Sequence, residues 1–469
     1  MPQFSRSVFV LTILALSLSV SACRNDWQVL SEFDGGKVTR GEIRSAFKLM
    51  DGQAGLEMQD RVLTDLSLLK ITALEASKQG LDKGDEFQKR MQVFEKLAYM
   101  GALEQELIGQ SKKKKFKLME LQFAYLQEPT KPQKRKEEAE DLAKKLNAAS
   151  DSDAQKLILQ KTENKRYGIL GGYVDPLCVS CNPNPYAFIT DAAAKADGKF
   201  VVVEDPNGFW IVRRINEKEY SGDDVRAVFE AYWKKTMRIA RATLPTLPDN
   251  QERKEFESAL LGEPQIEQMA KQQSEQLVKR ESQGLLQKRI EERKTKLGYE
   301  ALPGMRAYFE NKDAKALPGP DAGFKLSGKT ILLSDLMVGL PDDLSPDKRP
   351  IIQQVLLPYE VLKDDELQKD TLNSAQYSFL KDWNRNNQLA ILFLGKQKIP
   401  EVTEQEIMDR FKLRQFDEFK NQSLGAVRDR LKAEIESGNR QAFMKKTQEE
   451  LSKKYNLKMY KDKLKGGEL

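Results

Sequence analysis

Apolar residues recur with the spacing of an amphipathic α-helix through much of this 469-residue chain. The clearest run follows one helix face over residues 59–80: Val62, Leu66, Leu69, Ala73 and Ala76. Gly80 ends this run, and a second run with the same spacing begins at Phe87. Charged residues make up 32% of the chain against 40% hydrophobic residues, so each helix has a wide solvated face and little apolar surface to bury. The sequence therefore predicts elongated helical modules with thin cores.

The chain contains no histidine. This excludes Ser-His-Asp and Cys-His catalysis, histidine-ligated metals and imidazole proton shuttles. Lysine and arginine number 77 against 71 aspartate and glutamate residues, and a net charge of +6 is too small for a dedicated nucleic-acid binder of this length. We expect no cofactor, no metal ion and no nucleic-acid partner.

Residues 1–22 have the pattern of an export signal. Arg6 provides a short positive segment, and Val8–Val20 is apolar but too short to span a bilayer comfortably. The residues that follow, Val20-Ser-Ala-Cys23, resemble the bacterial lipobox, which implies cleavage before Cys23 and diacylation of its sulfur. Lipidation would hold the mature chain at a membrane surface. The alternative is an ordinary secretory signal in which the cysteine occurs by chance.

Cys178 and Cys181 form a Cys-x-x-Cys motif within the proline-rich segment 176–185. A zinc site needs about four ligands, and without histidine or further cysteines this motif does not supply them alone. Three prolines predict a loop here, whereas a thioredoxin-type redox motif opens a helix after a strand. We expect a loop disulfide or a reduced pair, with a redox role as the less favoured alternative.

The segment Gly323–Thr330 fits the pattern G-x-x-x-x-G-K-T of phosphate-binding loops. That mechanism needs a strand before the loop and a helix after it, whereas here Pro318-Gly-Pro precedes and the β-prone Ile331-Leu-Leu follows. We therefore expect no nucleotide. The neighbouring residues 326–336 resemble residues 33–43, since both contain Gly-Lys and then an acidic–aliphatic pair that opens a helix, which indicates a weak internal repeat.

Residues 116–220 contain two distinctive motifs, Gly208-Phe-Trp-Ile-Val-Arg213 and Gly168-Ile-Leu-Gly-Gly-Tyr173. The first is similar to the closing strand of parvulin-type prolyl isomerases, and the second to the glycine turn of that family. Residues 118–126 would form the opening strand, and residues 137–146 the helix that follows it. The resemblance implies a four-stranded sheet wrapped by helices, with the Phe209–Val212 strand inside it.

The resemblance also identifies the positions of the family's reactive pocket. A parvulin places two histidines and an Asp or Cys there, to act on the twisted amide that precedes proline. The closing-strand histidine is replaced by Trp210, the opening-strand histidine falls at Leu121 or Gln122, and the Asp or Cys position falls near Asn164. We take Gln122, Asn164 and Trp210 as the degenerate pocket positions and assign no catalytic residue. The resemblance then implies a packing or peptide-docking module, with residual isomerase activity as the alternative.

The segments on either side resemble the SurA/PrsA/PpiD class of exported folding factors. Residues 27–110 resemble its N-terminal helical module, and residues 400–465 resemble the segment that returns to complete this module. The predicted fold class is α+β and predominantly α-helical, with SurA-like helical modules and one parvulin-like α/β domain. The predicted division is a lipoprotein signal at 1–22, a SurA-like module at 23–115, a degenerate parvulin-like domain at 116–220, a helical region and linker at 221–322, and a second SurA-like and C-terminal helical module at 323–469.

The function that this resemblance implies is a lipid-anchored chaperone of the bacterial envelope. Its partners would be unfolded or nascent exported polypeptides, including outer-membrane proteins, and its favoured location is the periplasmic side of the outer membrane. One alternative is an active peptidyl-prolyl cis-trans isomerase with an atypical pocket. Another is a structural or surface lipoprotein that binds one specific partner.

Overall fold

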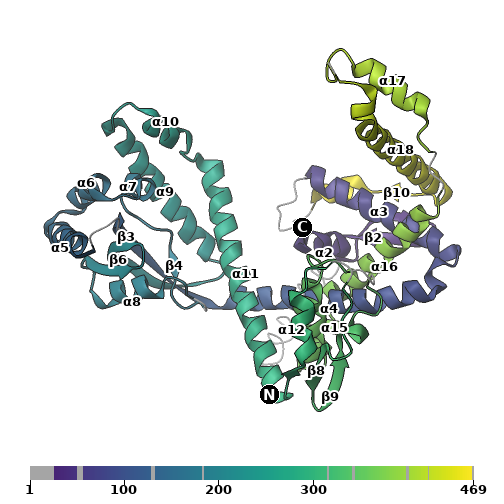
Figure 1. Cartoon of the computed structure of the whole chain (residues 1–469), viewed down its shortest axis with the longest axis horizontal. Coiled ribbons are helices and arrows are strands. Elements are labelled where there is room, and N and C mark those ends of the chain that lie inside the picture. The colour runs from purple at the N-terminus through teal and green to yellow at the C-terminus, as the bar shows by residue number, and fades with distance from the viewer. Residues whose placement is uncertain are drawn as a thin grey trace, which may run out of the picture. The chain divides into compact units, whose positions relative to one another are not determined.

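The structure, a computed structural model, describes residues 26–49, 56–127, 132–181, 184–313, 316–340, 344–397, 401–420 and 422–466. The predicted export signal at 1–22 and the predicted lipidation position Cys23 lie outside these residues. The chain divides into two compact units (Figure 1). Unit 1 contains the described residues up to Leu103 and those from Arg293 onward, and unit 2 contains Glu104–Glu292.

Unit 1 consists mainly of helices with two small sheets. Its first elements are β1 (Val29–Phe33), β2 (Gly36–Thr39), α2 (Arg40–Leu49), α3 (Leu56–Lys78), a 3-10 turn at Leu81–Lys83 and the first part of α4 (Asp85–Lys113). Its later elements are the end of α11 (Glu263–Lys296), β7 (Glu300–Ala301), α12 (Pro303–Glu310), β8 (Gly323–Leu326), β9 (Lys329–Leu332), α13 (Leu333–Leu336), a π-helical turn at Ile352–Leu356, α14 (Leu357–Leu362), α15 (Gln368–Leu372), α16 (Ala375–Gly395), α17 (Glu404–Arg414), α18 (Leu424–Lys454), β10 (Lys458–Met459) and a 3-10 helix at Lys461–Gly466. The helix expected over residues 59–80 is present as α3, and Gly80 follows it with a left-handed φ of 74°.

The two sheets of unit 1 are built alike. In each, a hairpin leads into a helix, as β1–β2–α2 in the first case and β8–β9–α13 in the second. A short edge strand that follows a long helix completes each sheet, giving the orders β10-β1-β2 and β7-β8-β9. The internal repeat is therefore confirmed as a hairpin-and-helix unit. The phosphate-loop pattern lies in the β8–β9 hairpin, where Phe324 pairs with Ile331 and Lys325 with Thr330, instead of forming a loop between a strand and a helix.

The C-terminal segment returns to the N-terminal hairpin. Strand β10 pairs antiparallel with β1, and the Asp34 amide donates to the Tyr455 carbonyl at 2.8 Å. Glu75 on α3 accepts hydrogen bonds at Oε2 from Lys454 Nζ at 2.6 Å and from the Tyr455 hydroxyl at 2.8 Å. One apolar core joins side chains from three distant parts of the chain: Phe33, Ile71, Ala73, Ala76, Phe87, Met91, Leu389, Phe393, Leu451 and Tyr455. The return expected for residues 400–465 is thus made by α18, β10 and the residues that follow.

Unit 2 is a four-stranded antiparallel sheet with helices on both faces. Its elements are the end of α4, β3 (Lys115–Gln127), α5 (Pro132–Ala148), α6 (Asp151–Lys161), α7 (Lys165–Ile169), β4 (Leu177–Cys178), α8 (Ala187–Lys195), β5 (Val201–Asp205), β6 (Gly208–Ser221), α9 (Val225–Thr243), a 3-10 turn at Leu244–Thr246, α10 (Gln251–Ser258) and most of α11. The strand order is β4-β3-β6-β5, so β6, which contains Phe209–Val212, is an inner strand. The four-stranded sheet expected for this part of the chain is confirmed.

Alternate side chains of the two inner strands, β3 and β6, pack into two different cores on opposite faces of the sheet. Ala124, Leu126, Phe209 and Ile211 face α5 and α6, whereas Leu121, Phe123 and Val212 face α8. Successive strand residues point to opposite faces of a sheet, so both faces of β3 and β6 are apolar and both need a covering layer of helices. Together with the helix-rich unit 1, this sheet confirms the predicted α+β, predominantly α-helical class.

The division of the chain differs from the four-part organisation expected after the export signal. Helices α9 and α11 do not form a separate region, because Phe229 and Leu277 share a core with Phe116 and Leu118 of β3. The segment 302–322, expected to be a linker, contains α12, and its Met305 and Tyr308 are buried. Segments distant in sequence thus complete each other's cores, which local composition does not indicate. Among the described helices, none is both long enough and apolar enough to cross a bilayer.

The first prediction concerns Glu75, which links the returning segment to α3. Burial alone would raise the pKa of this carboxyl, but hydrogen bonds from Lys454, Tyr455 and Gln79 outweigh it and hold the pKa at about 2, against 4.5 for the free side chain. Since the folded-state pKa is the lower one, the ionised carboxylate stabilises the fold above about pH 4.5, and this contribution is lost as the pH falls toward 2.

We expect Glu75→Gln to lower the free energy of unfolding at neutral pH by up to about 3 kcal/mol. The difference from the parent protein should shrink as the pH falls from about 4.5 toward 2, because both proteins then carry a neutral group at this position. Urea unfolding followed across this pH range measures it, with Glu450→Gln on the exposed face of α18 as the matched control. An effect that is independent of pH would contradict this role for the carboxylate.

Candidate functional site

A cavity of about 280 Å³ lies in unit 2. Leu121 and Phe123 of β3 and Trp210 and Val212 of β6 line it from the sheet. These four side chains lie on the face of the sheet that α8 covers. They share this face because every second residue of a strand points to the same side of the sheet. The sheet therefore presents an apolar and aromatic surface to the cavity.

Three other groups of residues complete the walls. One wall is Tyr186 and Ile189, at and just after the start of α8. A second is Leu177, Cys178 and Cys181, from β4 and the loop after it. The third comes from the helices beyond the sheet, with Phe229 on α9 and Gln273, Gln276, Leu277 and Arg280 on α11. Residues from about 120 to 280 thus meet around one pocket.

Trp210, predicted from the sequence as a pocket position on the closing strand, lines this pocket. Its ring lies 4.9 Å from that of Phe123 and 5.0 Å from that of Tyr125, centroid to centroid. Its indole Nε1 donates to Asp205 Oδ2 at 2.6 Å, at the end of β5. The one polar atom of this side chain is therefore engaged within the domain, and the ring contributes apolar surface.

The other two predicted pocket positions lie elsewhere. Gln122 is fully buried outside the pocket, where its Nε2 donates to the Gly171 carbonyl at 2.7 Å and its Oε1 accepts from Arg213 Nε at 2.9 Å. Of the two positions proposed for the opening-strand histidine, Leu121 and Gln122, Leu121 lines the pocket, because neighbours on a strand face opposite ways. Asn164 caps the N-terminus of α7, accepting at Oδ1 from the Tyr167 amide, and does not line the pocket.

A carboxylate that the sequence did not indicate lies in the pocket wall. Asp175 Oδ2 accepts from Gln273 Nε2 at 2.7 Å, and Gln273 Oε1 in turn accepts from Trp233 Nε1 at 2.7 Å. Burial raises the pKa of the Asp175 carboxyl, and hydrogen bonds from Tyr232 and Gln273 offset part of that rise. The partners of Asp175 lie about 60 to 100 residues further along the chain, so no local pattern points to this cluster.

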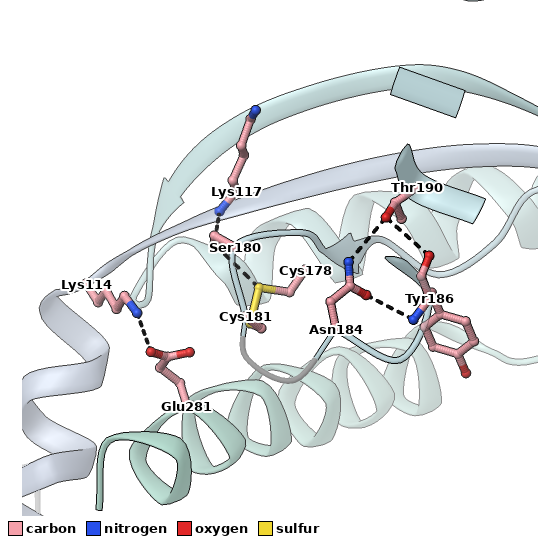
Figure 2. The surroundings of a disulfide bond; sticks show 9 residues. All are labelled: Lys114, Lys117, Cys178, Ser180, Cys181, Asn184, Tyr186, Thr190 and Glu281. Atoms are coloured by element: carbon pink, nitrogen blue, oxygen red, sulfur yellow. Dashed lines mark hydrogen bonds and ion pairs between the residues drawn. A yellow bond between two sulfur atoms is a disulfide. The ribbon is translucent and has the colours of Figure 1, made fainter. Parts of the chain in front are cut away.

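Cys178 and Cys181 are joined by a disulfide bond with an S–S distance of 2.05 Å (Figure 2). The loop that they close is fixed to the start of β3, where the Lys117 amide donates to Ser180 Oγ at 3.0 Å and the Val179 amide to the Lys117 carbonyl at 2.9 Å. Further along, the side chain of Asn184 donates to Thr190 Oγ1 at 3.2 Å and accepts from the Tyr186 amide at 3.0 Å. These contacts position two walls of the pocket.

The walls of this pocket contain both apolar and polar groups. Its surface combines aromatic rings with a few polar groups, most of them already hydrogen-bonded within the domain. In the part of the chain that the structure describes, no three Cys, Asp or Glu residues come together as metal ligands. An apolar cavity with a small number of convergent polar groups is the usual form of a ligand-binding site.

The fold and the pocket define an α+β protein with a cavity on one face of an antiparallel sheet. A family model described only as ":-like" matches residues 4–319, which is more than half of the chain. The chain belongs to this family, whose description states no activity, ligand or partner. No curated protein matches the chain.

The second prediction concerns the disulfide. It closes a loop of only four residues, so by chain entropy its removal costs about 2 kcal/mol or less, too little to unfold the unit. We expect Cys178→Ser/Cys181→Ser to leave the sheet folded and to speed hydrogen exchange selectively between Leu177 and Thr190. Peptide-resolved exchange measured against the oxidised parent, with the chemically reduced parent as the matched control, tests this. Equal loss of protection across β3 and β6 would show that the bond supports the whole unit.

Proposed function

We propose that this protein is a lipid-anchored chaperone of the bacterial envelope that holds unfolded exported polypeptides, with a parvulin-like domain that docks peptides without isomerising them. The observation that carries the proposal is the pocket on the sheet of unit 2, whose sheet side is apolar and includes Trp210 and Leu121, which the resemblance matches to histidine positions of a parvulin. Such a pocket offers an extended chain a place to bind and offers no imidazole to the amide that precedes proline.

The order of elements in unit 2 supports the parvulin-like assignment. An opening strand β3 is followed by the helix α5, then by a glycine turn, and the chain closes on the inner strand β6. In the turn, Gly172 has a φ of 78°, and a Cβ there would lie 2.5 Å from the Phe123 carbonyl oxygen, so only glycine fits. The backbone of the turn therefore lies directly against β3, and this close approach explains why the turn contains glycine.

The groups in the pocket favour binding over catalysis. Rotation about a peptide bond has a barrier of about 18–20 kcal/mol, and a catalyst must stabilise the twisted amide more than either planar form. The indole N–H of Trp210 is directed to Asp205, and the Asp175 carboxylate accepts from Gln273. Both groups already form hydrogen bonds within the domain. They are therefore poorly placed to stabilise the charge that develops on an amide as it twists.

Unit 1 supports a holding role through exposed apolar side chains. Leu413 and Phe416, at the turn between α17 and α18, are 78% and 77% exposed, and Ile391 on α16 is 56% exposed. Exposed apolar groups of this kind give an unfolded chain places for weak contacts, while the charged helix faces keep the protein in solution. The hairpin-and-helix repeat and the returning C-terminal segment support the SurA-like assignment of this unit.

The third prediction tests the choice between chaperone and enzyme. We expect the full chain to suppress aggregation of a reduced, unfolded substrate at or below equimolar concentration. In a proline-peptide assay, the isomerisation rate should stay within about twofold of the uncatalysed rate. Clear acceleration would favour the alternative of an active isomerase. No effect on aggregation, combined with capture of one specific folded partner, would favour the structural lipoprotein.

The fourth prediction concerns Cys23, the lipidation position of the lipobox-like segment. Two acyl chains give stable membrane association, so the parent protein expressed in a bacterial host should fractionate with membranes and incorporate labelled fatty acid. Cys23→Ala should abolish both. The variant Cys178→Ser/Cys181→Ser is the matched control, because it retains Cys23 and should remain lipidated. Unchanged membrane association of Cys23→Ala would contradict the anchor.

A further inference from the structure

We infer that the pocket of unit 2 selects extended polypeptide segments in which a large apolar side chain lies beside an aspartate or glutamate, and that Arg280 binds the carboxylate. This inference rests on the proposed peptide-docking role of the pocket and adds what the pocket prefers. It assigns a specificity-determining residue to α11, a helix outside the segment that resembles a parvulin.

The interior of the pocket suits one large apolar side chain. Its volume of about 280 Å³ lies just below the range of about 300–1,000 Å³ that is typical of drug-sized ligands, so it has room for a side chain with its adjoining backbone. The rings of Phe123, Tyr167, Tyr186 and Trp210 line it. Aromatic rings that pack at their preferred angles gain about 0.5–1.5 kcal/mol beyond the burial of area, which favours Phe, Tyr or Trp as the side chain that enters.

Arg280 places an uncompensated positive charge at the pocket. It lines the cavity while its side chain remains exposed to solvent, and within the described part of the chain it forms no ion pair. Its neighbour Glu281 is buried and forms an ion pair with Lys114, as Figure 2 shows. The guanidinium group is therefore available to a ligand, and its planar fork of donors matches a carboxylate.

Asp175, the acidic residue of the pocket, disfavours a negatively charged group in the pocket interior. Asp175 is half-buried, and its carboxylate accepts a hydrogen bond from Gln273 on the same helix as Arg280. A carboxylate of the ligand is repelled from Asp175 and attracted to the exposed Arg280. This arrangement orients the ligand, with the apolar side chain inside and its acidic neighbour at the solvent-exposed edge.

Gln276 supports the inference that the acidic residue of the bound peptide is an internal residue of an extended chain. It precedes Arg280 by one helical turn, lines the same pocket and is exposed. Its amide both donates and accepts, so it can pair with the backbone of a polypeptide that continues past the pocket, while Arg280 binds the acidic side chain. We therefore commit to an internal Asp or Glu, and binding that requires a free C-terminal carboxylate is the competing outcome.

The fifth prediction is tested by fluorescence anisotropy with the full chain and short labelled peptides that are acetylated and amidated at their ends. A peptide containing Phe-Asp should bind about three- to tenfold more tightly than the same peptide with Phe-Asn, because one charge-assisted contact is lost. The Ala-Asp version should lose most of its binding. Arg280→Gln should weaken binding of the Phe-Asp peptide to the level of the Phe-Asn peptide and leave the Phe-Asn peptide unchanged.

The control is Lys288→Gln, which removes one positive charge from an exposed position of the same helix outside the pocket and should change neither affinity. Equal binding of the Phe-Asp and Phe-Asn peptides, or an unchanged preference in Arg280→Gln, would overturn the inference and leave the docking role intact. A preference that appears only with a free C-terminal carboxylate would also overturn it. If none of the peptides binds, both the inference and the docking role fail.

Discussion

The antiparallel pairing of β3 with β6 is the interaction on which the candidate site depends. The ladder runs from Lys115 opposite Ser221 to Gln127 opposite Gly208, with one irregularity after Glu120. Because side chains alternate along both strands, this single register puts Leu121 and Trp210 in the pocket and Gln122 and Arg213 on the other side of the sheet. A shift of one residue would exchange the two sets, so the apolar character of the pocket follows from the register.

The helices that follow the sheet turn this surface into a cavity. Phe229 of α9 and Leu277 of α11 pack into the core beside β3, and this packing brings Gln273 and Arg280 to the pocket. A parvulin-like sheet domain without α9 and α11 would lack these polar groups. If the pocket selects its peptides by charge, as we propose, the selectivity comes from a part of the chain that the parvulin resemblance does not cover.

Several elements were predictable because their signals are local. The apolar spacing before Gly80 predicted α3, the motif around Trp210 resembled an inner strand of the parvulins, and the prolines between 176 and 185 predicted a loop, which begins after Cys178. The sequence left Leu121 and Gln122 as alternatives, because a pattern match that is uncertain by one position does not fix the face of a strand, and Leu121 is the one that lines the pocket. Asp175 was missed because the partners that bury it, Tyr232 and Gln273, are distant in sequence.

The sequence by itself determined the helical class and the absence of imidazole chemistry, since periodicity and composition act residue by residue along the chain, and its resemblance to parvulins implied the four-stranded sheet. Only the tertiary structure decided which segments share a core: the chain after Lys454 completes the hairpin at Val29–Thr39, and α11 completes the pocket. The reason is that burial of apolar surface is not directional. An amphipathic face shows that it must be covered, and it does not show which distant segment covers it.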